Sequence, residues 1–171
     1  HELELGIQLT GINPDGIIRE VECVIANSET TAKFLLTKYD VAKDRLQIHN
    51  PSLPSELELK KRQNNSNADE KLKFIIGSSG TALSQKGALL FVQLAHIMNQ
   101  KYPQNNFVFK WVGNHSVMQH ELEQNILDAG LNGKVIFTGE KEDPFEEYVD
   151  FDFFISLSRE ESFGLACMEA A

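Results

Sequence analysis

Residues 151–171 read FDFFISLSREESFGLACMEAA and carry the clearest structural signal in the chain. The apolar run over residues 151–157 is typical of a buried parallel strand. A short polar loop follows, and from Phe163 onward small and apolar residues predict a helix. A strand that passes through a loop into a helix is half of an α/β unit, and open α/β sheets bind ligands at the carboxyl ends of their strands. The sequence therefore predicts a binding site in this loop.

Two carboxylates, Glu161 and Glu169, flank the predicted site at a spacing of eight residues. Eight residues of helix rise about 12 Å, so the two side chains can contact opposite ends of an extended ligand. Backbone amides near Phe163, Gly164 and Leu165 suit an anionic group such as a phosphate, and Gly164 permits close approach to the backbone. Hydroxyls at both ends and a diphosphate between them describe a nucleotide sugar. The alternative is that Glu161 is a first-turn acid favoured by the helix dipole and that Glu169 is a solvated helix residue.

Strands and helices alternate from Lys71 to the end of the chain, which predicts a doubly wound, Rossmann-like parallel sheet. The expected strands cover residues 72–76, 107–112, 134–138 and 152–157, and the expected helices cover 84–101, 116–129, 144–149 and 163 onward. Before them, short strands are expected at 22–26 and 45–49, with a helix over 28–38 that Ser28 caps. Prolines, asparagines and mixed charges at 51–70 predict a linker.

A glycine-rich turn, residues 77–87, follows the first strand of that pattern and is the second candidate site. A turn of this kind at the end of a strand can hold phosphate through backbone amides, and Lys86 would add a point charge. The alternative is a tight turn next to a surface lysine.

The composition excludes several classes of function. The chain has 171 residues, of which 42% are hydrophobic, and this is enough for one well-buried domain but too little for two full ones. A net charge of −9 argues against nucleic acid or an anionic membrane as the main partner, and no apolar run is long enough to span a bilayer. Cys23 and Cys167 lie in apolar segments and are expected to be buried thiols rather than a disulfide. His115 and His120 are five residues apart, which does not suit metal ligands on a helix.

Other polar and aromatic positions have ordinary structural explanations. Trp111 lies in an apolar strand and is expected in the core, and His96 on an apolar helix is expected in the core or at its boundary. The acidic run Glu140–Glu147 is expected to be a solvated face around a turn.

Four segments, in the right order along the chain, resemble the retaining, nucleotide-sugar-dependent glycosyltransferases of family four, the glycosyl transferases group 1. They are VIANSE at 24–29, QIHNP at 47–51, FIIGSSGT with SQKG at 74–81 and 84–87, and the Glu-x7-Glu pair formed by Glu161 and Glu169. The resemblance implies the C-terminal half of a GT-B fold, truncated at both ends. Residues 1–50 would be a remnant of the N-terminal domain, 51–70 a linker, and 71–171 an incomplete nucleotide-sugar-binding domain.

The resemblance implies retaining transfer of a sugar from an NDP-sugar to a hydroxyl acceptor. The acceptor would be a glycan, a lipid-linked compound or a small molecule, and the process would be glycan or polysaccharide biosynthesis. No cofactor and no obligatory metal are expected. The location would be the cytoplasm or the periphery of the inner membrane face, and this piece of chain alone is expected to be inactive.

The resemblance also assigns roles to residues. Glu161 would be catalytic and hold the donor sugar, Glu169 would hold the ribose, and Thr138 and Gly139 would lie near the base. The remaining donor-binding residues would be Gly77, Ser79, Gly80, Lys86, Phe163, Gly164 and Leu165, with His1 as a sugar contact from the N-terminal domain.

The chain departs from the family pattern at the glycine-rich turn. Many members have arginine where Ser78 stands, and Gln85 occupies the position before Lys86, so one charge of the expected basic pair is missing. This departure favours one alternative, a non-catalytic nucleotide-sugar-binding or regulatory domain of the same fold. A second alternative is a GT-B-shaped sugar-nucleotide epimerase.

Overall fold

A computed structural model describes residues 13–53 and 73–171 of the chain. These residues form two units. The first unit contains residues 13–53 together with Glu160–Leu165, and the second contains residues 73–159 and Ala166–Ala171. His1 and most of the predicted linker lie outside the described residues; residues 51–53, which are described, have no regular structure.

The first unit is a short parallel α/β arrangement. It is built, in chain order, from α2 (Pro14–Glu20), β1 (Val24–Ala26), α3 (Glu29–Lys38), the 3-10 turn η1 (Lys43–Arg45) and β2 (Leu46–Ile48). The two strands pair in parallel. Ser28 Oγ accepts a hydrogen bond from the Thr31 amide at 3.1 Å, which confirms the predicted cap of α3.

The segment Glu160–Leu165 is attached to the first unit through Ser162. The Asn27 side-chain amide donates to Ser162 Oγ at 3.2 Å, and Ser28 Oγ donates to the Ser162 carbonyl at 2.6 Å. The turn between β1 and α3 therefore fixes the loop that contains Glu161.

The second unit contains the larger sheet. Its elements are β3 (Lys73–Ser79), the 3-10 turn η2 (Ser84–Lys86), α4 (Ala88–Lys101), β4 (Asn106–Val112), α5 (Gln119–Asp128), β5 (Val135–Phe137), α6 (Phe145–Tyr148) and β6 (Phe153–Phe154); α7 (Leu165–Glu169) begins at the boundary with the first unit. The strands lie in the order β5-β4-β3-β6 and every pairing is parallel. The predicted Rossmann-like parallel sheet is therefore confirmed.

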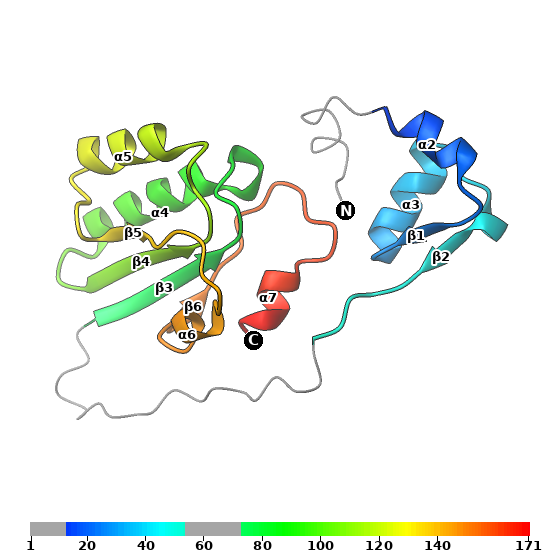
Figure 1. Cartoon of the computed structure of the whole chain (residues 1–171). Helices are drawn as coiled ribbons and strands as arrows, with labels where there is room; N and C mark the ends of the chain where they lie inside the picture. The colour runs from blue at the N-terminus through cyan, green and yellow to red at the C-terminus, as the bar shows by residue number, and fades with distance from the viewer. Residues whose placement is uncertain (1–12, 54–72) are drawn as a thin grey trace. The chain divides into compact units, whose positions relative to one another are not determined.

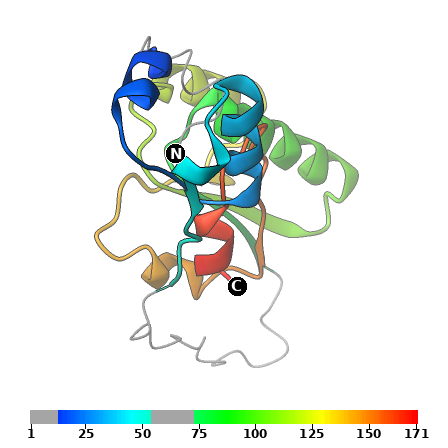
Figure 2. The same ribbon diagram turned by 90° about the vertical axis from the view of Figure 1, so that its right-hand side faces the viewer.

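Helices cover both faces of this sheet. Figure 1 shows α4 and α5 above the strands and α6 below them, and the turned view in Figure 2 keeps this order. The main core lies under α4 and α5, where the Phe91 ring meets the rings of Phe109 and Trp111 edge-on at 5.4 and 5.3 Å. Trp111 is 1% exposed, as predicted for a core residue. Lys110, between Phe109 and Trp111 in β4, contacts α6 on the other face.

An aromatic cluster attaches α6 to that second face. The Tyr148 ring lies 5.6, 5.7 and 5.9 Å from the rings of Phe145, Phe151 and Phe154. Gly77 in β3 makes room for this cluster, because a Cβ at that position would overlap the Phe151 ring. The structure thus explains this glycine by packing.

Several element boundaries differ from the predicted ones. β3 continues through Ser79, so the residues expected in a glycine and serine loop from Gly77 lie in a strand. The helix expected from Ser84 begins at Ala88, because Gly87 adopts a left-handed conformation with φ of 80° that ends η2 and precedes α4. The last helix begins at Leu165 rather than Phe163.

Two expectations about burial are wrong. Cys23 and Cys167 are exposed rather than buried. The run Glu140–Glu147 is not wholly a solvated face, because the Glu147 side chain is only 19% exposed and pairs with lysines.

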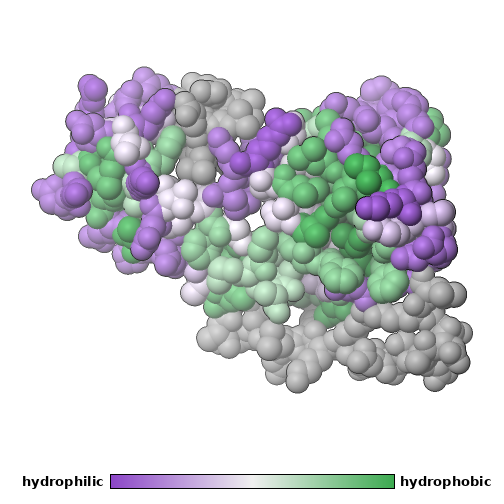
Figure 3. All heavy atoms as spheres, turned by 180° about the vertical axis from the view of Figure 1, so that it is seen from behind, coloured by the Kyte–Doolittle hydropathy of each residue, from purple (hydrophilic) through white to green (hydrophobic). Residues whose placement is uncertain are grey.

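Apolar side chains also reach the surface of the second unit. Figure 3 shows a green surface of hydrophobic residues on this unit, seen from behind. The large apolar side chains exposed in the second unit are Leu90, Ile97, Val117, Leu127, Ile136, Phe153 and Met168. Phe153, at 59% exposure, lies on β6, the last strand in the sheet order.

Candidate functional site

The loops that follow the parallel strands are joined at the carboxyl edge of the second unit's sheet. The Gly80 amide donates to the Val112 carbonyl at 2.9 Å, and Trp111 Nε1 donates to the Gly80 carbonyl at 2.8 Å. Gly113 pairs with Gly139 in an antiparallel bridge. The ends of β3, β4 and β5 therefore form one edge, which is the place where α/β sheets bind ligands.

The turn that carries Lys86 lies at this edge. Lys86 is the last residue of η2 and is half-buried. The Arg159 amide donates to the Gln85 carbonyl at 2.8 Å, so the chain that follows β6 supports the turn. A Cβ on Gly87 would overlap the Leu157 carbonyl, which gives this glycine a steric reason besides its left-handed φ. The predicted residues Ser79, Gly80 and Lys86 thus share one end of the sheet.

Gln85 stands directly before Lys86 in η2. Its side-chain oxygen is buried and finds no hydrogen-bond partner within the described part of the chain. A neutral amide cannot provide the charge of a lysine or an arginine. Lys86 is therefore the cation that this turn offers.

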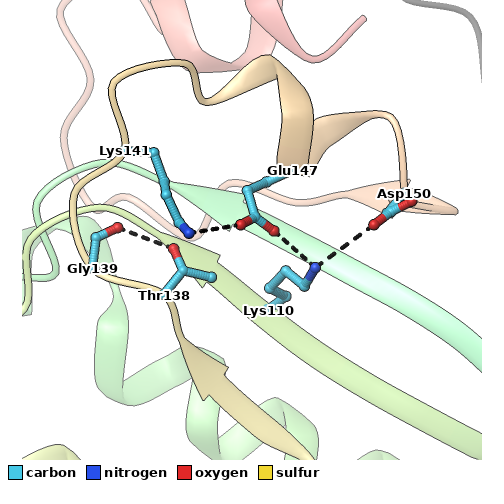
Figure 4. Close-up of polar contacts among 6 residues, drawn as sticks. All are labelled: Lys110, Thr138, Gly139, Lys141, Glu147 and Asp150. Atoms are coloured by element: carbon cyan, nitrogen blue, oxygen red, sulfur yellow. Dashed lines mark hydrogen bonds and ion pairs between the residues drawn. The ribbon is translucent and has the colours of Figure 1, made fainter.

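The predicted base-binding residues Thr138 and Gly139 follow β5. The Thr138 amide donates to the Trp111 carbonyl at 2.9 Å, which continues the sheet pairing, and Thr138 Oγ1 donates to the Gly139 carbonyl at 3.0 Å (Figure 4). Gly139 has a φ of 78°, in the left-handed region that favours glycine.

An ion-pair network that the sequence analysis missed joins this loop to α6 and β4. Glu147 accepts hydrogen bonds from Lys110 at 2.8 Å and Lys141 at 3.1 Å, and Asp150 lies 3.9 Å from Lys110 (Figure 4). The side chains of Lys110 and Glu147 are only 17% and 19% exposed. The hydrogen bond from Lys110 holds the pKa of Glu147 below its usual value, although burial acts in the opposite direction.

We expect Glu147→Gln to lower the free energy of unfolding of the second unit by about 1 kcal/mol near neutral pH. The pKa of Glu147 is lowered in the folded state, so its contribution to stability is present above the unfolded-state value and is lost as pH falls through the folded-state pKa. The difference between parent and variant should therefore shrink on acidification. Urea unfolding followed by the fluorescence of Trp111, the single tryptophan, measures it at about pH 7 and about pH 3.5.

The matched control is Glu142→Gln, which neutralises an exposed carboxylate in the same acidic run. Its unfolding midpoint should stay close to that of the parent at both pH values. If Glu147→Gln lowered stability equally at both pH values, the ion pair would not be what stabilises α6.

Glu169 lies on α7 and interacts with α6. Burial raises the pKa of its carboxyl group, while a side-chain hydrogen bond from Tyr148 acts in the opposite direction. The Tyr148 hydroxyl also lies 2.7 Å from Ser79 Oγ at the end of β3. The Tyr148 hydroxyl therefore lies at the edge that contains the glycine-rich turn.

The first unit contains the remaining predicted residues, which are Glu161, Phe163, Gly164 and Leu165. Glu161 is exposed, and its Cγ lies 3.5 Å from the position of a Cβ built on Gly164. Apart from its chain neighbours, no other atom of the described residues lies within 4 Å of that Cβ position. Glycine is favoured here because the backbone has a φ of 81°, in the left-handed region. Phe163 is half-buried and Leu165 is exposed.

Over residues 13–53 and 73–171, no three side chains among the His, Cys, Asp and Glu residues come together as a metal ion would need. No helix within them has both the length and the apolar character to cross a membrane.

The sequence model of the family Glycosyl transferases group 1 matches residues 59–171. This match covers more than half of the chain, and the chain belongs to this family. The predicted resemblance is thereby confirmed.

A curated relative and two solved structures are similar to this chain over most of its length. The chain is 29% identical over 157 residues to the lipopolysaccharide core biosynthesis mannosyltransferase LpsB of Rhizobium meliloti (strain 1021), and the match covers 90% of this chain and 44% of the relative. A variant of S. aureus TarM, in complex with Fondaparinux, alpha-GlcNAc-glycerol and UDP, has a TM-score of 0.71 at 20% identity, covering 91% of this chain and 29% of that one. Anabaena Alr3699/HepE in complex with UDP-glucose has a TM-score of 0.70 at 20% identity, covering 92% and 46%.

These similarities confirm the GT-B type of fold. The chain spans less than half the length of the curated relative. Activity, substrate and acceptor of the whole protein are therefore matters for proposal.

Proposed function

We propose that this chain supplies donor-binding residues of a glycosyltransferase that transfers a sugar from an NDP-sugar to a hydroxyl acceptor. The observation that carries this proposal is the family match over residues 59–171, which includes both Glu161 and Glu169. The carboxyl edge of the sheet supports it, because Ser79, Gly80 and Lys86 lie there together.

In this proposal the transferred sugar becomes oxocarbenium-like as its bond to the diphosphate breaks. Negative charge then builds up on the leaving phosphate, and a preorganised cation stabilises it electrostatically. Lys86 is the residue we assign to this task, together with backbone amides at Phe163, Gly164 and Leu165. The mechanism needs no obligatory metal, and the stereochemistry would be retaining, as the family resemblance implies.

Different residues would recognise the two ends of the donor, its sugar and its nucleoside. Glu161 would accept hydrogen bonds from hydroxyls of the donor sugar, and Glu169 from the ribose hydroxyls. Thr138 and Gly139 would contact the nucleotide base. Gly77 would contribute indirectly, because its lack of a side chain leaves room for the Phe151 ring that packs against α6. We place the reaction in lipopolysaccharide or related glycan biosynthesis, because LpsB is a lipopolysaccharide core mannosyltransferase. The location that the family resemblance implies is the cytoplasm or the inner membrane face.

A thermal-shift screen of the full-length protein against UDP-, GDP- and ADP-sugars tests the proposal. One nucleotide series should raise the melting temperature in a concentration-dependent way, because a ligand that binds only the folded state stabilises it. The 171 residues alone should bind donor weakly and show little turnover, because the relatives they match are more than twice as long. If no nucleotide sugar shifted the full-length protein, the proposal would be wrong.

A second candidate is a non-catalytic nucleotide-sugar-binding domain. It is favoured by Ser78, which stands where many family members have arginine, so that one charge of the expected basic pair is missing. The two candidates differ in turnover. Release of free NDP in the presence of a hydroxyl acceptor supports the enzyme, whereas binding without release supports the second candidate.

A further inference from the structure

We propose that Ser28 is a positioning residue of the donor site, whose hydroxyl holds the loop that contains Glu161 in place for the donor sugar. This inference rests on the proposed function, since it gives an anchor to the residue assigned to that sugar. It concerns a residue in the turn between β1 and α3 for which the sequence pattern predicted only a helix cap.

The first step of the argument is the direction of the hydrogen bond from Ser28. Its Oγ lies 2.6 Å from the Ser162 carbonyl oxygen and 3.1 Å from the Thr31 amide. A carbonyl oxygen can only accept, so the single hydroxyl proton of Ser28 goes to Ser162, while the hydroxyl oxygen accepts from Thr31. The same hydroxyl therefore caps α3 and holds the Ser162 carbonyl.

The second step is that Asn27 holds the same residue from its side chain. Thr31, which is only 8% exposed, donates from Oγ1 to Asn27 Oδ1 at 2.8 Å. The amide nitrogen at the other end of the Asn27 side chain donates to Ser162 Oγ at 3.2 Å. The first turn of α3 thus orients both Asn27 and Ser28 toward Ser162.

The third step connects Ser162 to Glu161, which belongs to the same unit. Ser162 is held at both its side chain and its carbonyl, and the Cα of Glu161 is only one peptide unit, about 3.8 Å, away. The Glu161 side chain is exposed, so packing in a core does not fix it. The bonds from Ser28 and Asn27 therefore set the place from which Glu161 reaches a ligand.

The fourth step is the effect of an anchored loop on binding. A loop that is already ordered loses less conformational freedom when a ligand binds, and the gain is largest for the ligand that makes the most contacts with the loop. In the proposed function the nucleoside diphosphate and the nucleotide sugar both meet backbone amides of this loop, but only the nucleotide sugar meets the Glu161 carboxylate. The anchor therefore favours the nucleotide sugar over the free diphosphate.

Ser28→Asp in the full-length protein tests the inference, because an aspartate still caps α3 but has no proton to donate to Ser162 at neutral pH. Calorimetry measures the affinity for the UDP-, GDP- or ADP-sugar that stabilises the parent most, and for the matching nucleoside diphosphate. The readout is the ratio of the nucleotide-sugar affinity to the diphosphate affinity, since losses common to both ligands cancel in it. We expect this ratio to fall roughly threefold to tenfold.

Further variants separate positioning from a general structural effect. Ser28→Gly removes the same donor without adding a charge and should lower the ratio as Ser28→Asp does, whereas Ser28→Thr keeps the hydroxyl and should keep the ratio near that of the parent. The matched control is Thr37→Val, which removes a hydroxyl that donates within α3, to the Lys33 carbonyl at 2.8 Å. In a Glu161→Gln background, Ser28→Asp should change the ratio little further, because its effect passes through the lost carboxylate.

The possible outcomes are distinguishable. A parent protein that binds neither ligand contradicts the proposed function itself. A parent that binds both, with Ser28→Asp and Ser28→Gly variants whose affinity ratios equal that of the parent, overturns the role of Ser28 alone. A fall in the ratio that is as large in the Glu161→Gln background as in the parent also overturns it, because the effect would then not pass through Glu161.

Discussion

Replacing Glu169 with glutamine should weaken the binding of a nucleoside diphosphate and of the matching nucleotide sugar by the same factor, about tenfold to 150-fold. The factor is the same because both ligands carry the ribose that Glu169 is proposed to hold. It is large because a hydrogen bond to a charged acceptor contributes about 1.5–3 kcal/mol.

The pH dependence of this interaction gives a second signature. Burial raises the pKa of Glu169, so the carboxylate is neutralised at a higher pH than an ordinary glutamate. Affinity of the parent should therefore decline as pH falls toward that raised value, whereas Glu169→Gln, which cannot titrate, should lack this decline.

Isothermal titration of both ligands against the full-length protein and its variant measures these effects. Glu121→Gln, which changes an exposed carboxylate on α5, is the matched control and should leave both affinities unchanged. If Glu169→Gln altered neither affinity, the simpler interpretation of Glu169 as a solvated helix residue would be correct.

The strands β3 and β4 were predictable because each buries apolar residues in a continuous run. β6 covers only Phe153–Phe154 of the predicted range 152–157, and its Phe153 is exposed. β4 follows the predicted range 107–112 to within one residue, and β5 lies inside the predicted 134–138. The alternation with helices was sufficient to indicate a parallel sheet, since parallel neighbours need a crossover between them. These properties are local in sequence and could be detected there.

The errors arise where a neighbour in space decides the outcome. Gly77 looked like part of a phosphate-binding turn, but its missing Cβ is explained by Phe151, which is distant in the chain. Cys23 precedes the apolar strand β1 and Cys167 lies in the short helix α7, yet both thiols are exposed. Sequence periodicity does not indicate which face of a short element will be covered.

The ion pairs around α6 were also not predicted from the sequence, although one residue, Lys110, indicated that a charged partner was needed. Lys110 is a charged residue inside the apolar strand FVFKWV, and a charge at such a position needs a partner. Its partner, Glu147, is 37 residues away, so only the folded structure identifies it. Tyr148 gave no comparable signal, because its ring fits an ordinary core position and its hydroxyl meets Ser79, which is distant in the chain.

Replacing Glu161 with glutamine should weaken the binding of the nucleotide sugar by about tenfold to 150-fold. The affinity for the free nucleoside diphosphate should stay nearly unchanged. The sugar is the only part that the diphosphate lacks, so a residue that contacts the sugar alone affects only the larger ligand. Glu161 is well placed to reach a ligand, since its side chain is exposed while Ser162 next to it is anchored by Asn27 and Ser28.

The matched control is Glu160→Gln, which neutralises the adjacent carboxylate that the Glu-x7-Glu spacing leaves out. Titration of both ligands against both variants compares the two positions in the full-length protein. Selective loss of the nucleotide sugar in Glu161→Gln but not in Glu160→Gln supports the assignment. Equal weakening of the diphosphate and the nucleotide sugar by Glu161→Gln would instead place this residue at the nucleotide, because only groups that the two ligands share can produce equal losses.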